Sequence, residues 1–207
     1  DVAVIDQTES SPIVYDFAHS AINSIFSNSP INLVGGTLTV DSTVQVNNAF
    51  DLMAGTLANA TILPGTGGQG LTLTAAGGTL ANVTTEADID ATAANATATV
   101  LNNLQLDGTL RLGLPDSNNS AALDFNMTGQ SGGITGHGTV VFGQMISDEL
   151  ANVSSGSANQ VFSIGADITL AAQTGLIDAG GGAIQNDGTI QVGRLIVHGN
   201  LINNGQL

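Results

Sequence analysis

The sequence contains no cysteine, no tryptophan and no lysine, and its two arginines are Arg111 and Arg194. Without cysteine the chain cannot form a disulfide framework, and cysteine usage says nothing about its redox compartment. The 17 acidic residues give a formal net charge of −15. This charge argues against nucleic acid as a partner, because neutralising phosphates requires clustered Lys and Arg. It disfavours anionic membrane surfaces for the same reason.

Charged residues make up only 9% of the 207 positions, and aromatic residues 3%. A globular α/β enzyme carries about 25% charged residues. Solubility must therefore come from Asn, Gln, Ser and Thr, which suits long β-surfaces with Asn- and Gly-rich turns. No apolar stretch approaches the roughly 18 residues of a transmembrane helix, so we expect no membrane insertion. The first residues, DVAVID, lack the pattern of a signal peptide, so an exported protein would be a mature or excised form.

A short phrase, Gly-Thr followed by an aliphatic residue, recurs along the chain. It begins at six glycines: Gly36, Gly55, Gly78, Gly108, Gly138 and Gly188. Successive glycines are 19, 23, 30, 30 and 50 residues apart, and the last interval fits two units. An imperfect repeat of roughly 20 to 30 residues indicates a solenoid. We expect the aliphatic residues of the phrases to stack in one core column, one per coil: Leu38, Leu57, Leu80, Leu110, Val140 and Ile190.

Around these phrases the residues alternate with period two, as in Leu38-Thr39-Val40 and Leu110-Arg111-Leu112. The alternation predicts half-buried strands, with aliphatic side chains inward and polar ones, including Arg111, outward. Asn-Gly and Asp-Gly pairs predict tight corners, since Gly supplies positive φ and Asn tolerates it. An antiparallel sandwich would also use such turns, but its hairpins would recur at about 8 to 12 residues. The longer unit favours an all-β fold of three-stranded coils, a parallel β-helix.

The N-terminal segment has a different pattern. Ser10-Ser11-Pro12 offers a capping hydroxyl and a proline for the first turn of a helix. Apolar residues follow at helical spacing: Val14, Phe17, Ala18, Ala21, Ile22 and Ile25. We therefore predict an N-terminal strand and an amphipathic helical cap over residues 1–30. Residues 31–207 would then form a β-solenoid of about seven to nine coils, a rod about 35 to 45 Å long.

Four stretches carry a family resemblance: GGTLTV (35–40), LQLDGTLRLG (104–113), GITGHGTVVFG (133–143) and NDGTIQV (186–192). They resemble the repeats of bacterial cell-surface right-handed β-helices, the filamentous-haemagglutinin-like and autotransporter-passenger adhesins. The resemblance covers about 85% of the chain and lies in the style of the repeat. It implies a right-handed β-helix that is secreted or displayed at the cell surface.

Other β-helices are polysaccharide lyases or glycoside hydrolases, so enzymatic chemistry has to be considered. The lyases use a Lys or Arg base beside calcium-binding acids, but Arg111 and Arg194 are far apart in this sequence. Glycosidases need two carboxyl groups about 5 to 9 Å apart. Asp88-Ile89-Asp90 places two carboxylates on one strand face, and Asp148-Glu149 are adjacent. No serine lies in a nucleophile-elbow motif, and we predict no catalytic site.

Two kinds of non-catalytic site remain. Glu86, Asp88 and Asp90 could form a row of oxygen ligands for calcium, the one cofactor that the sequence suggests, although a solvated acidic strand edge explains them as well. Six asparagines occupy Asn-X-Ser/Thr acceptor motifs for glycosylation, of which three or four would arise by chance in this composition: Asn59, Asn82, Asn95, Asn118, Asn126 and Asn152. The three histidines, among them His137 between two glycines, are interpreted as isolated corner or surface residues.

The sequence thus predicts a non-enzymatic extracellular protein with a structural or adhesive role. We expect the chain to bind further copies of itself, stacked head to tail in a filament, and to bind surface glycans. The alternative to a filament of copies is that the chain forms part of a longer adhesin rod. DVAVID (1–6) would be the strand that pairs with an open end at Asn203-Asn204-Gly205-Gln206-Leu207. The alternative is a β-helix that binds or degrades carbohydrate through an acidic groove near Glu86, Asp88 and Asp90.

Overall fold

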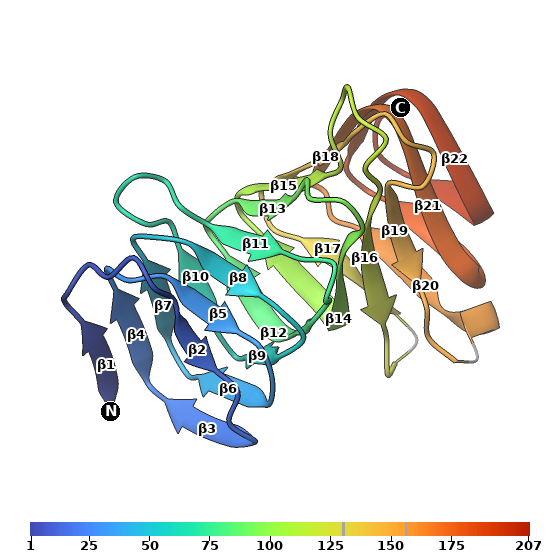
Figure 1. The fold of residues 1–207 in the computed structure, drawn as a ribbon. Helices are drawn as coiled ribbons and strands as arrows, with labels where there is room; N and C mark the ends of the chain where they lie inside the picture. The colour runs from blue at the N-terminus through green and yellow to red at the C-terminus, as the bar shows by residue number, and fades with distance from the viewer. Residues whose placement is uncertain (130, 156) are drawn as a thin grey trace.

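In the computed structural model the chain is a parallel β-solenoid of about nine turns (Figure 1). The structure describes residues 1–129, 131–155 and 157–207. Each turn contributes a strand to each of three faces, and every pairing between strands of successive turns is parallel in this part of the chain. The two termini lie at opposite ends of the solenoid (Figure 1). The prediction of a parallel β-helix is therefore confirmed.

We number the faces in chain order. The first face contains β1 (Val2–Ile5), β4 (Ser24–Ser27), β7 (Thr43–Val46), β10 (Thr61–Leu63), β17 (Ser131–Thr135) and β20 (Val161–Ile164). The second contains β2 (Ile13–Tyr15), β5 (Ile31–Leu33), β8 (Phe50–Leu52), β11 (Leu71–Leu73), β13 (Ile89–Ala91), β15 (Thr109–Leu112) and β18 (Thr139–Phe142). The third contains β3 (His19–Ile22), β6 (Thr37–Val40), β9 (Thr56–Ala58), β16 (Ala121–Asn126) and β19 (Glu149–Asn152).

Four longer strands bend around corners and so belong to more than one face. β12 (Thr79–Thr85) and β14 (Ala96–Leu106) run from the third face onto the first, while β21 (Thr169–Asn186) and β22 (Thr189–Asn203) run around all three. The only helical element in the described residues is a single 3₁₀ turn, η1 (Ser157–Asn159). No helix in the described parts of the chain has the length and apolar character needed to cross a bilayer.

The period-two pattern explains both the strands and the core. In β15, for example, Leu110 and Leu112 are fully buried while Arg111 between them is exposed, as the alternation predicts. The inward side chains of all three faces meet in one aliphatic core that runs along the solenoid. At the corners, asparagine and glycine adopt positive φ: Asn59, Asn82, Asn95 and Asn102 lie at 55° to 66°. Gly36 shows why glycine is required, since a Cβ there would overlap the carbonyl oxygen of Phe17.

The Gly-Thr phrases begin strands on two different faces. Leu38, Leu57 and Leu80 stack on the third face, whereas Leu110, Val140 and Ile190 belong to the second. The prediction of one continuous column is therefore wrong, although every one of these residues is buried. At all six glycines of the phrases an added Cβ would come within 3 Å of an atom of the preceding coil, so the corners before both faces need glycine. Leu170 lies between Val140 and Ile190, which confirms that the 50-residue interval spans two coils.

The predicted N-terminal helix is also wrong. Residues 13–27 form β2, β3 and β4, which pair in parallel with β5, β6 and β7 of the next coil. Val14 and Phe17 of the supposed helical stripe are 54% and 66% exposed. Short apolar runs do not distinguish helix from strand by period alone. Here parallel pairing with the following coil selects strands over a helix. DVAVID contains β1, which pairs with β4.

Candidate functional site

A polar groove of about 280 Å³ lies on the second face, between the β10–β11 loop and strands β11, β13 and β15. Outward residues stack across these strands in register: Thr72 lies beside Asp90, and Asp90 beside Arg111. We call this hollow the second-face groove. Its lining consists of Asn48, Ala49, Gly68, Gln69, Gly70, Leu71, Thr72, Asp88, Asp90 and Arg111.

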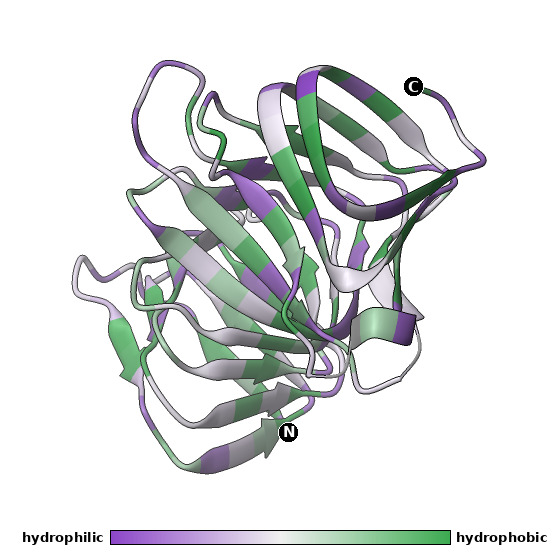
Figure 2. Ribbon diagram, turned by 90° about the vertical axis from the view of Figure 1, so that its right-hand side faces the viewer, coloured by the Kyte–Doolittle hydropathy of each residue, from purple (hydrophilic) through white to green (hydrophobic). Residues whose placement is uncertain are grey.

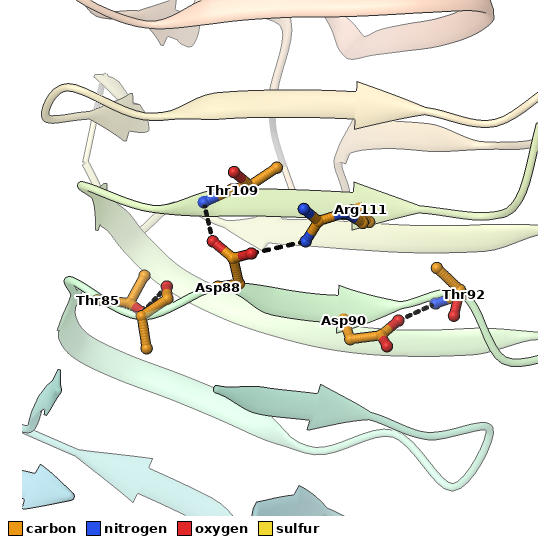
Figure 3. A network of polar contacts seen from close by, with 7 residues as sticks. Thr85, Asp88, Asp90, Thr92, Thr109 and Arg111 are labelled. Atoms are coloured by element: carbon orange, nitrogen blue, oxygen red, sulfur yellow. Dashed lines mark hydrogen bonds and ion pairs between the residues drawn. The ribbon is translucent and has the colours of Figure 1, made fainter. Parts of the chain in front are cut away.

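Asp88 and Arg111 form an ion pair at the edge of this groove (Figure 3). The Nη1 atom of Arg111 donates to Oδ2 of Asp88 at 2.7 Å, and the backbone N–H of Thr109 donates to Oδ1 at 2.8 Å. Burial by itself would raise the pKa of Asp88, but these hydrogen bonds and the charge of Arg111 outweigh it and lower the pKa. Asp88 is therefore held as a carboxylate that orients the guanidinium.

Asp90 and Glu86, the other two predicted calcium ligands, form no ion pair in the described residues, unlike Asp88. Asp90 accepts a 2.8 Å hydrogen bond from the backbone N–H of Thr92 through Oδ1 (Figure 3). Buried Ile89 separates Asp88 from Asp90, so both carboxylates lie on the outward face as expected. Glu86 is exposed and does not line the groove. Within the described residues no group of three His, Cys, Asp or Glu is arranged to hold a metal ion, and calcium binding stays a prediction.

The six acceptor asparagines divide into two groups. Asn59, Asn82, Asn95, Asn118 and Asn126 are exposed. Asn152 is buried, and its amide donates to Oε1 of Gln160 at 3.1 Å and to the carbonyl oxygen of Ala179 at 3.2 Å. A glycan on Asn152 would have to displace this network. Glycosylation remains a prediction, and the folded chain presents only the other five sites to a modifying enzyme.

The adjacent acids Asp148 and Glu149 point in opposite directions. Asp148 has no exposed surface, and its carboxylate accepts hydrogen bonds from the backbone N–H groups of Ala121 and Met145 at 3.1 and 3.2 Å. Burial raises its pKa, and the backbone hydrogen bonds partly offset the rise. Asp148 thus holds together the loops that precede β16 and β19. It is placed to organise the fold and does not share a surface with Glu149.

An acidic cluster on the third face was not predicted from the sequence. Asp124 and Asp178 both lie in register with Ala151, and Glu149 is close enough to interact with both charges. Burial raises the pKa of Glu149, and the charges of Asp124 and Asp178 raise it further. Burial also raises the pKa of Asp124. His198 lies 3.4 Å from Asp178. The acids are more than 20 residues apart, and only the coil lengths bring them together.

His137 is another residue whose neighbours come from adjacent coils. Its Nδ1 atom lies 3.3 Å from Asp107, and its Nε2 atom lies 3.6 Å from Asp167. Hydrogen bonds from the Gln105 side chain, and then from His137, lower the pKa of Asp107. The histidine does lie at a corner, as interpreted, but two acids flank it. Both are 30 residues away in the sequence, which equals the local coil length.

No protein-family model matches the chain, and neither a curated protein nor a solved structure is significantly similar to it. The class of protein is therefore defined by the fold, a parallel β-solenoid. The resemblance to surface adhesins stays an expectation drawn from the style of the repeats.

Proposed function

We propose that this chain is a non-enzymatic extracellular protein with a structural or adhesive role, a segment of a β-solenoid rod. One observation supports this proposal above the others: about nine turns wind around a single aliphatic core, and within the described residues each strand pairs only with strands of the adjacent coils. A fold built from nearest-neighbour contacts supplies length and a repeated outward surface. The extracellular location is proposed from the surface rich in Asn and Thr and from the style of the repeats.

Both ends of the solenoid can accept further coils. In the first coil, Ala3, Ile5, Ile13 and Tyr15 border an apolar hollow of about 250 Å³. Among the described residues β1, β2 and β3 are paired along one edge only, with β4, β5 and β6. Such edges are templates for another strand. We propose that coils of the same polypeptide or of a second copy continue the rod.

The last coil, at the C-terminal end of the solenoid (Figure 2), also leaves apolar side chains only partly covered. Val192, Leu195, Val197 and Leu201 are only half-buried, whereas Ile177 and Ile184 one coil earlier are fully buried. Gln206 already bridges Thr189 on the second face. The next strand would therefore follow on the third face, beside residues 194–198.

Light scattering after size-exclusion chromatography tests the self-assembly part of this proposal. The chain and a variant lacking residues 1–6 are compared over a range of concentrations. Concentration-dependent oligomers that disappear without β1 support stacking of copies. A chain that stays monomeric at high concentration, in calcium and without it, rules out stacking of copies and leaves continuation within one polypeptide.

A second experiment tests the non-enzymatic part. The chain is incubated with a panel of polysaccharides, and new reducing ends and unsaturated sugar products are measured. We expect no turnover. Turnover that Asp88→Asn abolishes would contradict the proposal, since Asp88 is the acid most firmly fixed in the second-face groove.

A further inference from the structure

The second-face groove has the features of a ligand site, and we propose that it binds a neutral saccharide. This inference rests on the proposed adhesive role and names the chemistry of the surface that the rod would recognise. It requires neither self-assembly nor catalysis.

Three polar side chains of the groove, those of Gln69, Asp90 and Arg111, are held by hydrogen bonds. Asp90 is held through Oδ1 by the backbone N–H of Thr92, and Arg111 is held through Nη1 by Asp88. Gln69 accepts a 2.9 Å hydrogen bond from the backbone N–H of Gly67 through Oε1. Side chains that are already oriented lose little conformational entropy when a ligand binds.

Each of these side chains presents a second polar atom that has no hydrogen bond within the described residues. Gln69 keeps its Nε2 donor, Arg111 keeps the donors of Nη2 and Nε, and Asp90 keeps its Oδ2 acceptor. The groove therefore offers donors and acceptors side by side over neighbouring coils. A sugar hydroxyl both donates and accepts, so vicinal hydroxyls match this mixture.

Charge and size narrow the class of ligand. Asp88 neutralises Arg111, Asp90 adds a negative charge, and the whole chain carries a net charge of −15. An anionic glycan would be repelled, whereas a neutral one would not. The volume of about 280 Å³ lies just below the range of small-molecule pockets, roughly 300 to 1,000 Å³, which suits one or two sugar units. No aromatic ring is part of the lining, so we expect weak binding, with a Kd of about 1 mM.

The test uses the full chain labelled with ¹⁵N and a panel of neutral trisaccharides of glucose, galactose, mannose or N-acetylglucosamine. We expect at least one to shift the amide resonances of Gly68, Gly70 and Thr72 in a saturable manner. Arg111→Gln and Asp90→Asn should each weaken that binding by about tenfold. Arg194→Gln, which changes the other arginine at the far end of the solenoid, should leave it unchanged.

Thermal melts of the variants check that all remain folded, as their exposed positions predict. Absence of saturable shifts with every trisaccharide at about 20 mM would overturn the proposal. So would binding that both groove variants retain, or tighter binding of a sulfated or uronate trisaccharide. Turnover of a bound sugar would instead contradict the non-enzymatic role and leave the binding site in place, so the two failures are distinguishable.

Discussion

Replacing Leu110 by alanine tests the stacked core at the middle of the rod. Leu110 has no exposed surface and lies between Ile89 and Val140 of the adjacent coils. The change removes three carbon atoms, worth about 2.4 kcal/mol at about 0.8 kcal/mol for each buried methylene. The cavity left behind adds to this cost. Because Ile89 and Val140 are held in strand register, the site cannot collapse fully, and we expect a total loss of about 3 to 4 kcal/mol.

Urea and thermal unfolding, followed by circular dichroism, measure the loss. For a chain of this length each 1 kcal/mol corresponds to about 2 to 4 °C in Tm, so the variant should melt roughly 6 to 16 °C lower. Leu114→Ala is the matched control, because Leu114 is 39% exposed in the loop after β15. It should lose no more than about 0.5 kcal/mol. Equal melting of the two variants would refute the assignment of Leu110 to the stacked core.

Three further predictions concern backbone, charge and modification. Gly133→Ala should destabilise the chain by more than about 1 kcal/mol, because φ is +144° and the added Cβ would meet backbone of the next coil. Gly129→Ala is the control: a Cβ there would have open space around it, so the unfolding midpoint should change little. Glu149 and Asp124 have raised pKa values, so their contribution to stability is lost as pH rises through the folded-state values. Tm should therefore increase as pH falls from neutral toward the ordinary carboxyl pKa values of about 4, and a Tm that falls over this range would contradict the prediction. After expression in a glycosylating host, intact mass and peptide mapping should find no glycan on Asn152; occupancy there would show that modification precedes folding.

The pH dependence should reverse in more acidic solution. Asp88 and Asp107 have lowered pKa values, so the stability that they contribute is present above the ordinary value and is lost as pH falls through the folded-state values. The midpoint should therefore pass through a maximum and then decrease below about pH 4.

The alternation of aliphatic and polar residues predicts the side on which individual residues lie, and together with the 19- to 30-residue spacing of the Gly-Thr phrases it predicts the fold class. Leu110 and Leu112 are inward and Arg111 is outward because successive side chains of a strand point to opposite faces, whatever the strand pairs with. Asp88 and Asp90 share the outward face for the same reason. The helix predicted from the apolar residues at positions 14–25 is wrong because a short apolar run fits both the helical and the strand period. Parallel pairing with the next coil selects the strand.

Only the tertiary structure decided which outward residues become neighbours. Coil length varies: Thr43 pairs with Thr61, 18 residues on, whereas Leu104 pairs with Ile134, 30 residues on. The ion pair of Asp88 with Arg111 and the groove beside it depend on the length of one particular coil. Inward or outward orientation is a local property of the strand backbone. Contact between coils depends instead on the sum of all the corner residues between them, which strand periodicity does not encode.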